Sequence, residues 1–190
     1  MRKLYDIDSI RCFKCGEEYF FPHGPGRVYY YSLVEIESSM DRLEYKDLIS
    51  VIIKPVWCFD CEAASVAEDI PTIREFEHTY KAVSDGVEIE VPFCSSNIPV
   101  KESQEILKSY ISWKMNRVAG EKCLHCGGAN FLTITEEMNL IHDSCEDGVF
   151  CHRLAARGPF NGPIYARVYS ADGEFKLEGN ANYSHVSVNK

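Results

Sequence analysis

The sequence has no long apolar run and no excess of positive charge. Its 190 residues include 20 Lys and Arg against 29 Asp and Glu, a formal net charge of −9. No run approaches the roughly 20 apolar residues needed to span a bilayer, so we expect no membrane segment. Nucleic-acid affinity depends largely on Lys and Arg that neutralise phosphates, so an acidic chain argues against nucleic-acid binding. Its charge suits basic partners instead.

The first residues, MRKLYDIDSIRC, also lack the apolar core of a signal peptide. We therefore expect a cytoplasmic protein, in which thiols stay reduced. The chain contains nine cysteines. In a reducing compartment this number indicates metal ligands rather than a disulfide framework.

Six of the cysteines form three Cys-x-x-Cys motifs: CFKC at 12–15, CFDC at 58–61 and CLHC at 123–126. One such motif supplies two ligands from a single turn, and Zn²⁺ prefers four thiolate or imidazole donors in a tetrahedron. Two motifs therefore complete one site. We predict that the first site consists of Cys12, Cys15, Cys58 and Cys61, with the long segment 16–57 between its two pairs.

The second site begins with the third motif. Downstream, HDSC supplies a histidine and a cysteine at the same two-residue gap, and the segment 127–141 separates them from the motif. This spacing is close to that of zinc ribbons. We predict that the second site consists of Cys123, Cys126, His142 and Cys145. Cys151 or His152 in place of His142 is the alternative. Two bound Zn²⁺ ions on seven thiolates would change the formal charge to −9 − 7 + 4 = −12.

These sites favour structural zinc over catalysis. A catalytic zinc needs an open coordination position and a general base, and the chain contains no His-Glu-x-x-His or deaminase-like pattern. A redox dithiol usually opens a helix, which the two glycines after Cys126 disfavour. We interpret Cys94 as a small buried apolar residue. No catalytic residue is therefore expected; a zinc-dependent hydrolase and a thiol redox enzyme are the alternatives.

Residue patterns predict alternating strands and helices. We expect strands at 26–37, 87–91 and 130–135, and an apolar run within 46–58 that Pro55 ends before the second motif. We also expect a hairpin at 162–179 around Ala171-Asp172-Gly173. Helices are expected at 62–69, from Pro71 to about 84, and at 99–118; the final polar residues are expected to fray. The fold class is thus α+β, with two zinc-ribbon-like β modules joined by helices. We place the modules at 1–97 and 98–190.

The segment SWKMNRVAGEKCLHCGG, followed by IHDSC and ARVYSADGEF, resembles a group of uncharacterised bacterial zinc-ribbon proteins. Their pattern is a helix with Trp and Arg, then Cys-Leu-x-Cys-Gly, then His-Pro-x-Cys-Gly-Gly and a strand-turn-strand. The residues at these places are Trp113, Arg117, Cys123, Cys126, His142 and Cys145. The resemblance covers about the C-terminal third. It implies zinc binding in a bacterial cytoplasmic protein and no particular activity.

We therefore expect a small scaffold or adaptor, with zinc as a structural element, that binds a protein. One alternative is an acidic immunity or inhibitor protein that binds a basic toxin. Another is a nucleic-acid-binding ribbon.

Overall fold

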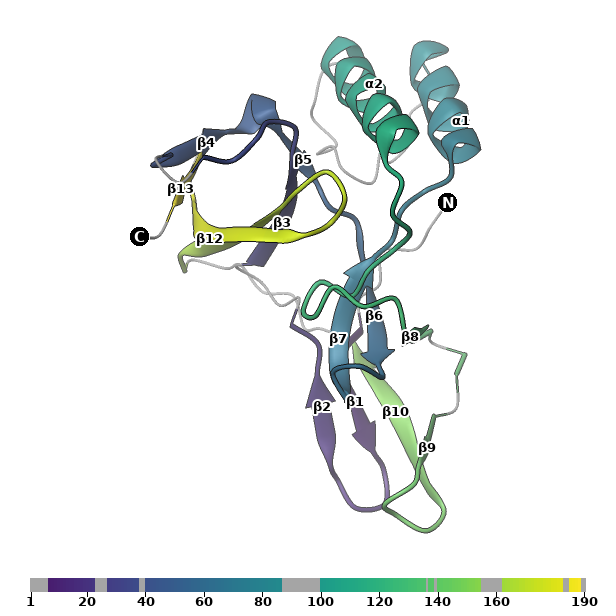
Figure 1. Ribbon diagram of the computed structural model, residues 1–190. Helices are drawn as coiled ribbons and strands as arrows, with labels where there is room; N and C mark the ends of the chain where they lie inside the picture. Colours follow the sequence, from purple (N-terminus) through teal and green to yellow (C-terminus); the bar gives the residue numbers. More distant parts are fainter. Residues whose placement is uncertain are drawn as a thin grey trace.

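The computed structural model describes residues 7–22, 27–37, 40–86, 100–135, 137–138, 140–154, 162–182 and 185–188. Within these residues the chain is mixed α+β and mostly β, in agreement with the predicted class (Figure 1). The predicted strand at 87–91 and Cys94 lie outside the described residues. None of the described helices has the length and apolar character that crossing a membrane requires.

The first sheet joins strands from both halves of the chain, in the antiparallel order β2-β1-β10-β9. Its strands are β1 (Ile7–Cys12), β2 (Glu18–Phe20), β9 (Leu140–His142) and β10 (Gly148–Leu154). The β1–β2 turn and the β9–β10 turn lie side by side at one end of this sheet (Figure 1). This is where the motif at 12–15 meets the turn that carries His142 and Cys145.

The second sheet has the order β7-β6-β8. Its strands are β6 (Ile53–Cys58), β7 (Ala63–Glu68) and β8 (Phe131–Thr133). The helix expected at 62–69 is wrong, because this segment forms the second strand of a hairpin and residues 65–70 are buried. Pro55 does not interrupt its strand. Its carbonyl oxygen accepts the N–H of Ile134 at 2.9 Å, just past the end of β8, so the missing donor lies where the ladder stops.

The third sheet has the order β4-β13-β12-β11-β3-β5, in which β3 and β11 are parallel. Its strands are β3 (Arg27–Ser32), β4 (Arg42–Glu44), β5 (Leu48–Ser50), β11 (Ile164–Tyr169), β12 (Phe175–Ala181) and β13 (His185–Val188), with a 3₁₀ turn, η1 (Tyr45–Asp47), before β5. The hairpin predicted at 162–179 is confirmed as β11 and β12. The fraying predicted for the chain end is wrong for β13, which pairs with β12 and β4 and buries Val186.

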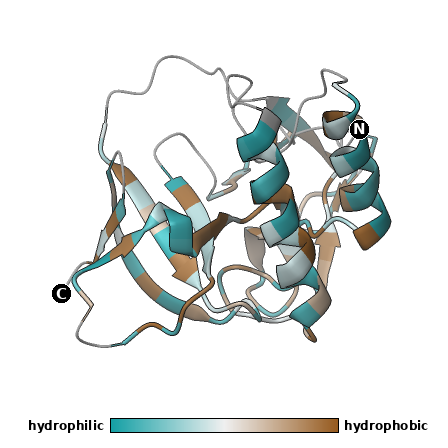
Figure 2. Cartoon of the chain, turned by 90° about the horizontal axis from the view of Figure 1, so that it is seen from above, coloured by the Kyte–Doolittle hydropathy of each residue, from teal (hydrophilic) through white to brown (hydrophobic). Residues whose placement is uncertain are grey.

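Both well-patterned helices are confirmed, as α1 (Ile73–Ser84) and α2 (Val100–Asn116). The first begins with a capping box, in which Thr72 and Glu75 each satisfy the other's backbone N–H. The helices lie side by side, and hydrophilic residues cover much of their outer surface (Figure 2). The apolar side of α2 meets the third sheet, and α1 packs against α2. Phe76, Leu107 and Tyr169 are buried in the largest core cluster.

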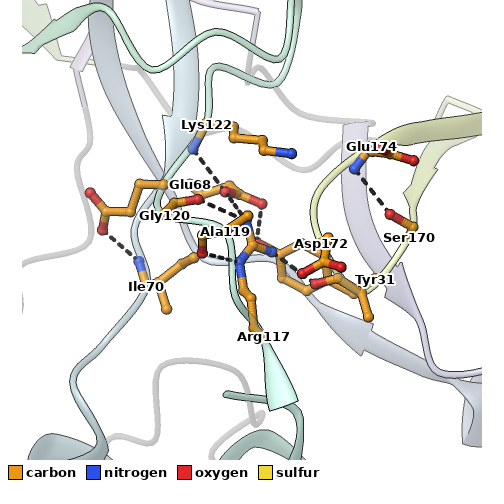
Figure 3. Close-up of polar contacts among 12 residues, drawn as sticks. Tyr31, Glu68, Ile70, Arg117, Ala119, Gly120, Lys122, Ser170, Asp172 and Glu174 are labelled. Atoms are coloured by element: carbon orange, nitrogen blue, oxygen red, sulfur yellow. Dashed lines mark hydrogen bonds and ion pairs between the residues drawn. The ribbon is translucent and has the colours of Figure 1, made fainter. Parts of the chain in front are cut away.

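A buried ion pair links α2 to two sheets (Figure 3). Arg117 Nη2 lies 2.6 Å from Glu68 Oε2, and both side chains are fully buried. The other carboxylate oxygen accepts the Tyr31 hydroxyl at 2.6 Å. The guanidinium also donates to the carbonyl oxygens of Ala119, Gly120 and Ala171, each at 3.0 Å. The charges are therefore paired and hydrogen-bonded, as buried charges must be.

Each of the three sheets combines strands from both sides of residue 97. The boundary placed between residues 97 and 98 therefore separates no sheet from another. This interleaving decides which cysteines can meet.

Candidate metal centres

The structure brings the eight predicted ligands into two groups of four. In each group the candidate ligand atoms all lie within 4.8 Å of one another. The outer site consists of Cys12, Cys15, His142 and Cys145. The inner site consists of Cys58, Cys61, Cys123 and Cys126. Each group could hold one metal ion.

The predicted combination of motifs is wrong. We expected the motif at 12–15 to close a site with the motif at 58–61, and each half of the chain to hold its own ion. Instead, β1 pairs with β10, which places the first motif beside the turn that carries His142 and Cys145. The two inner motifs meet because Ala67 forms a β-bridge with Cys123. Strand pairing thus produces a nested arrangement, with the inner ligands between the two outer pairs in sequence.

Each turn of the outer site contains one residue in the left-handed backbone conformation. In the first, Gly16 has φ +81° and donates its N–H to the Cys12 carbonyl oxygen at 3.0 Å. In the second, Asp147 takes the left-handed conformation at φ +58°, and Gly148 donates to the Cys145 carbonyl oxygen at 2.7 Å. The aspartate therefore fills a position that commonly needs glycine. A Cβ at residue 148 would lie 2.8 Å from the Cys145 carbonyl oxygen, which explains the glycine there.

In the outer site, the separation of a sulfur and a nitrogen donor fits a tetrahedral zinc. With Zn–S near 2.3 Å and Zn–N near 2.0–2.1 Å, a sulfur and a nitrogen ligand lie about 3.5 Å apart. Cys15 Sγ is 3.5 Å from His142 Nδ1. The other ring nitrogen, Nε2, lies 3.1 Å from a carboxylate oxygen of Glu17. This carboxylate favours the tautomer with the proton on Nε2, which leaves Nδ1 free to bind a metal.

The inner site uses the same kind of turn twice. Glu62, directly after the first inner motif, has φ +51°, and Gly127, directly after the second, has φ +75°. Gly127 donates its N–H to the Cys123 carbonyl oxygen at 2.9 Å. The second turn is tied to β7, because Leu124 donates to the Val66 carbonyl oxygen at 2.9 Å. The backbone therefore fixes both sulfur pairs.

The inner sulfur atoms also fit a tetrahedron. Four thiolates around zinc lie about 3.8 Å apart, given the Zn–S distance of about 2.3 Å. Cys58 Sγ is 3.6 Å from Cys126 Sγ, and Cys61 Sγ is 3.9 Å from Cys123 Sγ. These separations are far longer than the S–S bond of a disulfide, which is about 2 Å. All eight described cysteines are free thiols.

Local hydrogen bonds divide the thiols into two classes. The N–H of Cys15 lowers the pKa of Cys12 to about 6, against burial, which raises it. Burial also opposes ionisation of Cys123, but hydrogen bonds from Ser65 and from the turn N–H groups outweigh it and lower the pKa. Burial raises the pKa of Cys58 and Cys61. Each site thus contains at least one thiol whose surroundings favour the thiolate that metals bind.

The alternative ligands lie elsewhere. Cys151 is opposite Arg11 in the β1–β10 ladder and is exposed; neither it nor His152 belongs to the outer group. Sequence reasoning missed two supporting residues, Glu17 beside His142 and Ser65, whose Oγ lies 3.3 Å from Cys123 Sγ. No spacing rule identifies such residues, because their partners are far away in the sequence.

Comparison of the chain with protein-family models, curated proteins and solved structures found no match. The resemblance to bacterial zinc-ribbon proteins therefore stays a prediction.

Proposed function

We propose that the protein binds two structural Zn²⁺ ions, one in each site, and serves as a small protein-interaction scaffold. The observation that carries the metal assignment is the match between the donor separations, 3.5 to 3.9 Å, and the edges of a zinc tetrahedron. Soft thiolate donors, seven among eight ligands, favour zinc over magnesium or calcium.

The zinc is structural because each site supplies four protein donors. Structural zinc sites are closed in this way, whereas catalytic sites keep one position for water or substrate. Each ion also joins two turns far apart in the sequence. Binding to such a site supplies folding free energy, with apparent values of about 10–16 kcal/mol for structural zinc in small peptides.

Metal analysis of the full chain tests this assignment. We expect two zinc ions per chain after purification without added metal, and loss of cooperative thermal unfolding when a strong chelator removes them. Spectra after Co²⁺ substitution should show one S₄ and one S₃N environment. A metal-free protein that unfolds cooperatively and is unaffected by chelator would contradict the proposal.

An apolar row on the outer face of the first sheet supports the interaction role. Phe13 and Ile141 are 72% and 75% exposed, unusually high for large apolar side chains. Val149 connects them, because it lies opposite Ile141 and its carbonyl oxygen accepts the N–H of Phe13 at 3.2 Å. Phe20, 65% exposed, lies on the edge strand of the same sheet. Exposed apolar groups on one face are typical of protein-binding sites.

A matched pair of variants tests this surface. The double variant Phe13→Ser/Ile141→Ser should keep both zinc ions and the wild-type melting temperature but lose partners that the wild type captures. Val118→Ser is the control, because Val118 is 94% exposed just after the end of α2. Equal capture by all three proteins would exclude the apolar row as the binding surface.

The negative charge supports a second candidate, an immunity or inhibitor role toward a basic toxin. With two zinc ions the formal charge is −12, from −9 − 7 + 4. Association with a basic partner would then be fast and strongly reduced by salt. Binding that is insensitive to salt and depends on Phe13 favours the scaffold instead.

A further inference from the structure

We propose that the two metal sites are thermodynamically coupled, so that zinc in the inner site raises the affinity of the outer site, and the reverse. This inference rests on the proposed binding of zinc at both sites. Its consequence is that the protein loads and loses its two ions together, with little of the one-zinc form. Two features of the structure carry it: the nested connectivity and a continuous line of aromatic contacts.

Nested connectivity means that zinc in the inner site favours zinc binding at the outer site. Without the inner ion, the whole segment 16–141 separates Cys15 from His142. Once the inner ion joins its two motifs, the path between them runs only through the segments 16–57 and 127–141 and across the ion. Because closure entropy grows only with the logarithm of loop length, this shortening raises the outer affinity about threefold. Connectivity therefore contributes, but it is the smaller part.

The larger part comes from side chains that connect the sites. Trp57 precedes the inner ligand Cys58, and its ring meets Tyr19 edge to face at 5.4 Å between centroids. Tyr19 in turn contacts Phe150 at 5.6 Å. The Phe150 ring lies 4.6 Å from the imidazole of the outer ligand His142. The line from one ligand set to the other is thus unbroken.

Phe150 belongs to a core cluster against which Tyr19 and Trp57 pack. The cluster includes the outer ligand Cys12 together with Ile10 and Ile134, all buried, and Trp57 packs against it. The backbone adds a second connection, because Cys58 pairs with Phe131 at the start of β8, the strand that leads toward His142. When the inner site is empty, the turn that follows Cys58 is no longer held by the ion. The core cluster then loses the support that this turn gives it through Trp57. Packed cores respond as a unit, so the outer ligands lose their alignment.

Native mass spectrometry of the full chain under reducing conditions tests the coupling. At one equivalent of zinc, two independent sites give a one-zinc form amounting to at least about half of the molecules. We expect a much smaller one-zinc fraction for the wild type. Tyr19→Leu should increase that fraction and still bind two ions at excess zinc. The matched comparison is Tyr19→Phe, which keeps the ring but, like Tyr19→Leu, loses the hydroxyl contact with Glu17; its one-zinc fraction should be smaller than that of Tyr19→Leu. Tyr165→Leu, a change of an exposed tyrosine on the third sheet, is the control.

Reciprocity gives an independent measurement. Cys126→Ser, which disables the inner site, should lower the outer affinity by a factor in the usual range of about 5 to 150 for coupled sites, and Cys15→Ser should lower the inner affinity by the same factor. A wild-type one-zinc fraction of half or more would overturn the coupling, as would a Tyr19→Leu variant as cooperative as the wild type. Absence of any bound zinc would instead contradict the proposed function, so the two failures are distinguishable.

Discussion

Arg117 and Glu68 form an ion pair with 2.6 Å between Nη2 and Oε2, and neither side chain is exposed to solvent. Glu68 Oε2 also accepts the backbone N–H of Lys122 at 2.8 Å, one residue before the inner ligand Cys123. The rings of Tyr31 and Trp113 both face the guanidinium, with Arg117 Cζ 5.4 and 5.2 Å from their centroids. The pair therefore connects α2, two sheets and the entry to a metal site.

Removing one partner of this pair should destabilise the fold strongly. We expect Glu68→Gln to reduce the free energy of unfolding by about 3–5 kcal/mol, because the buried guanidinium then lacks its counter-charge. Denaturant unfolding measures the change. The double variant Glu68→Met/Arg117→Met should reduce the free energy of unfolding less than Glu68→Gln does, since it leaves no buried charge unpaired.

The surface pair Arg167–Glu178 provides the control for this measurement. Its side chains are 32% and 51% exposed. Glu178→Gln should therefore change the free energy of unfolding by less than about 1 kcal/mol. If Glu68→Gln lowers the free energy of unfolding no more than Glu178→Gln does, the buried network has no stabilising role.

Glu17 should strengthen zinc binding at the outer site without being a ligand. Its carboxylate oxygen lies 3.1 Å from His142 Nε2. Loss of such a partner typically lowers metal affinity by about 10–100-fold, so we expect this range for Glu17→Gln. Competition with a chromophoric chelator measures it. In Glu17→Gln, zinc affinity at the inner site should change only as much as the coupling between the sites requires. The remote variant Glu105→Gln should keep wild-type affinity at both sites.

The nested pairing of motifs can be tested by measuring which cysteines bound zinc protects from alkylation. In Cys58→Ser at saturating zinc, alkylation should modify Cys61, Cys123 and Cys126, because their ion is lost. The outer cysteines Cys12, Cys15 and Cys145 should stay protected. Mass spectrometry identifies the modified residues. If the motifs at 12–15 and 58–61 shared one ion instead, Cys58→Ser would expose Cys12 and Cys15 to alkylation and leave Cys123 protected.

Gly148 is expected to be required for the outer site. A Cβ there would lie 2.8 Å from the Cβ and carbonyl oxygen of Cys145, so the ligand must shift. Gly148→Ala should weaken zinc binding at the outer site, measured as bound zinc per chain at limiting metal. Gly120→Ala is the matched control, because a Cβ at Gly120 meets nothing within 4 Å. Equal zinc retention by both variants would show that the turn can adjust.

Buried tyrosines should make the protein sensitive to alkali. Burial raises the pKa of Tyr31 and of Tyr169 above the ordinary value of 10.0. A raised pKa in the folded state gives stability that is complete below about pH 10 and is lost as the pH rises further, since only the unfolded chain ionises there. The free energy of unfolding should therefore fall above about pH 10. The phenolate absorbance of the buried tyrosines should appear together with unfolding, and Tyr169→Phe should make the free energy of unfolding fall less steeply with pH.

Short-range patterns sufficed for several elements. The helix from Ile73 was recognisable because its apolar residues recur at three and four positions and Thr72 and Glu75 have capping spacing. The turn at Gly173 was recognisable because Asp-Gly between two alternating segments is a hairpin signal. The structure gives Gly173 a φ of +78°, which suits glycine. The strand at Ala63–Glu68 was not, since its alanines favour a helix in isolation and only pairing with β6 overrides this preference.

By itself the sequence determined which residues can hold metal, because a Cys-x-x-Cys turn presents two sulfur atoms wherever it lies in the fold. It determined the local turn chemistry too, through Gly16 and Gly127. Only the tertiary structure decided which turns share an ion. That choice depends on β1 lying against β10 and on Cys123 lying beside β7, contacts between residues far apart in sequence. Ligand spacing within one motif carries no information about such pairing.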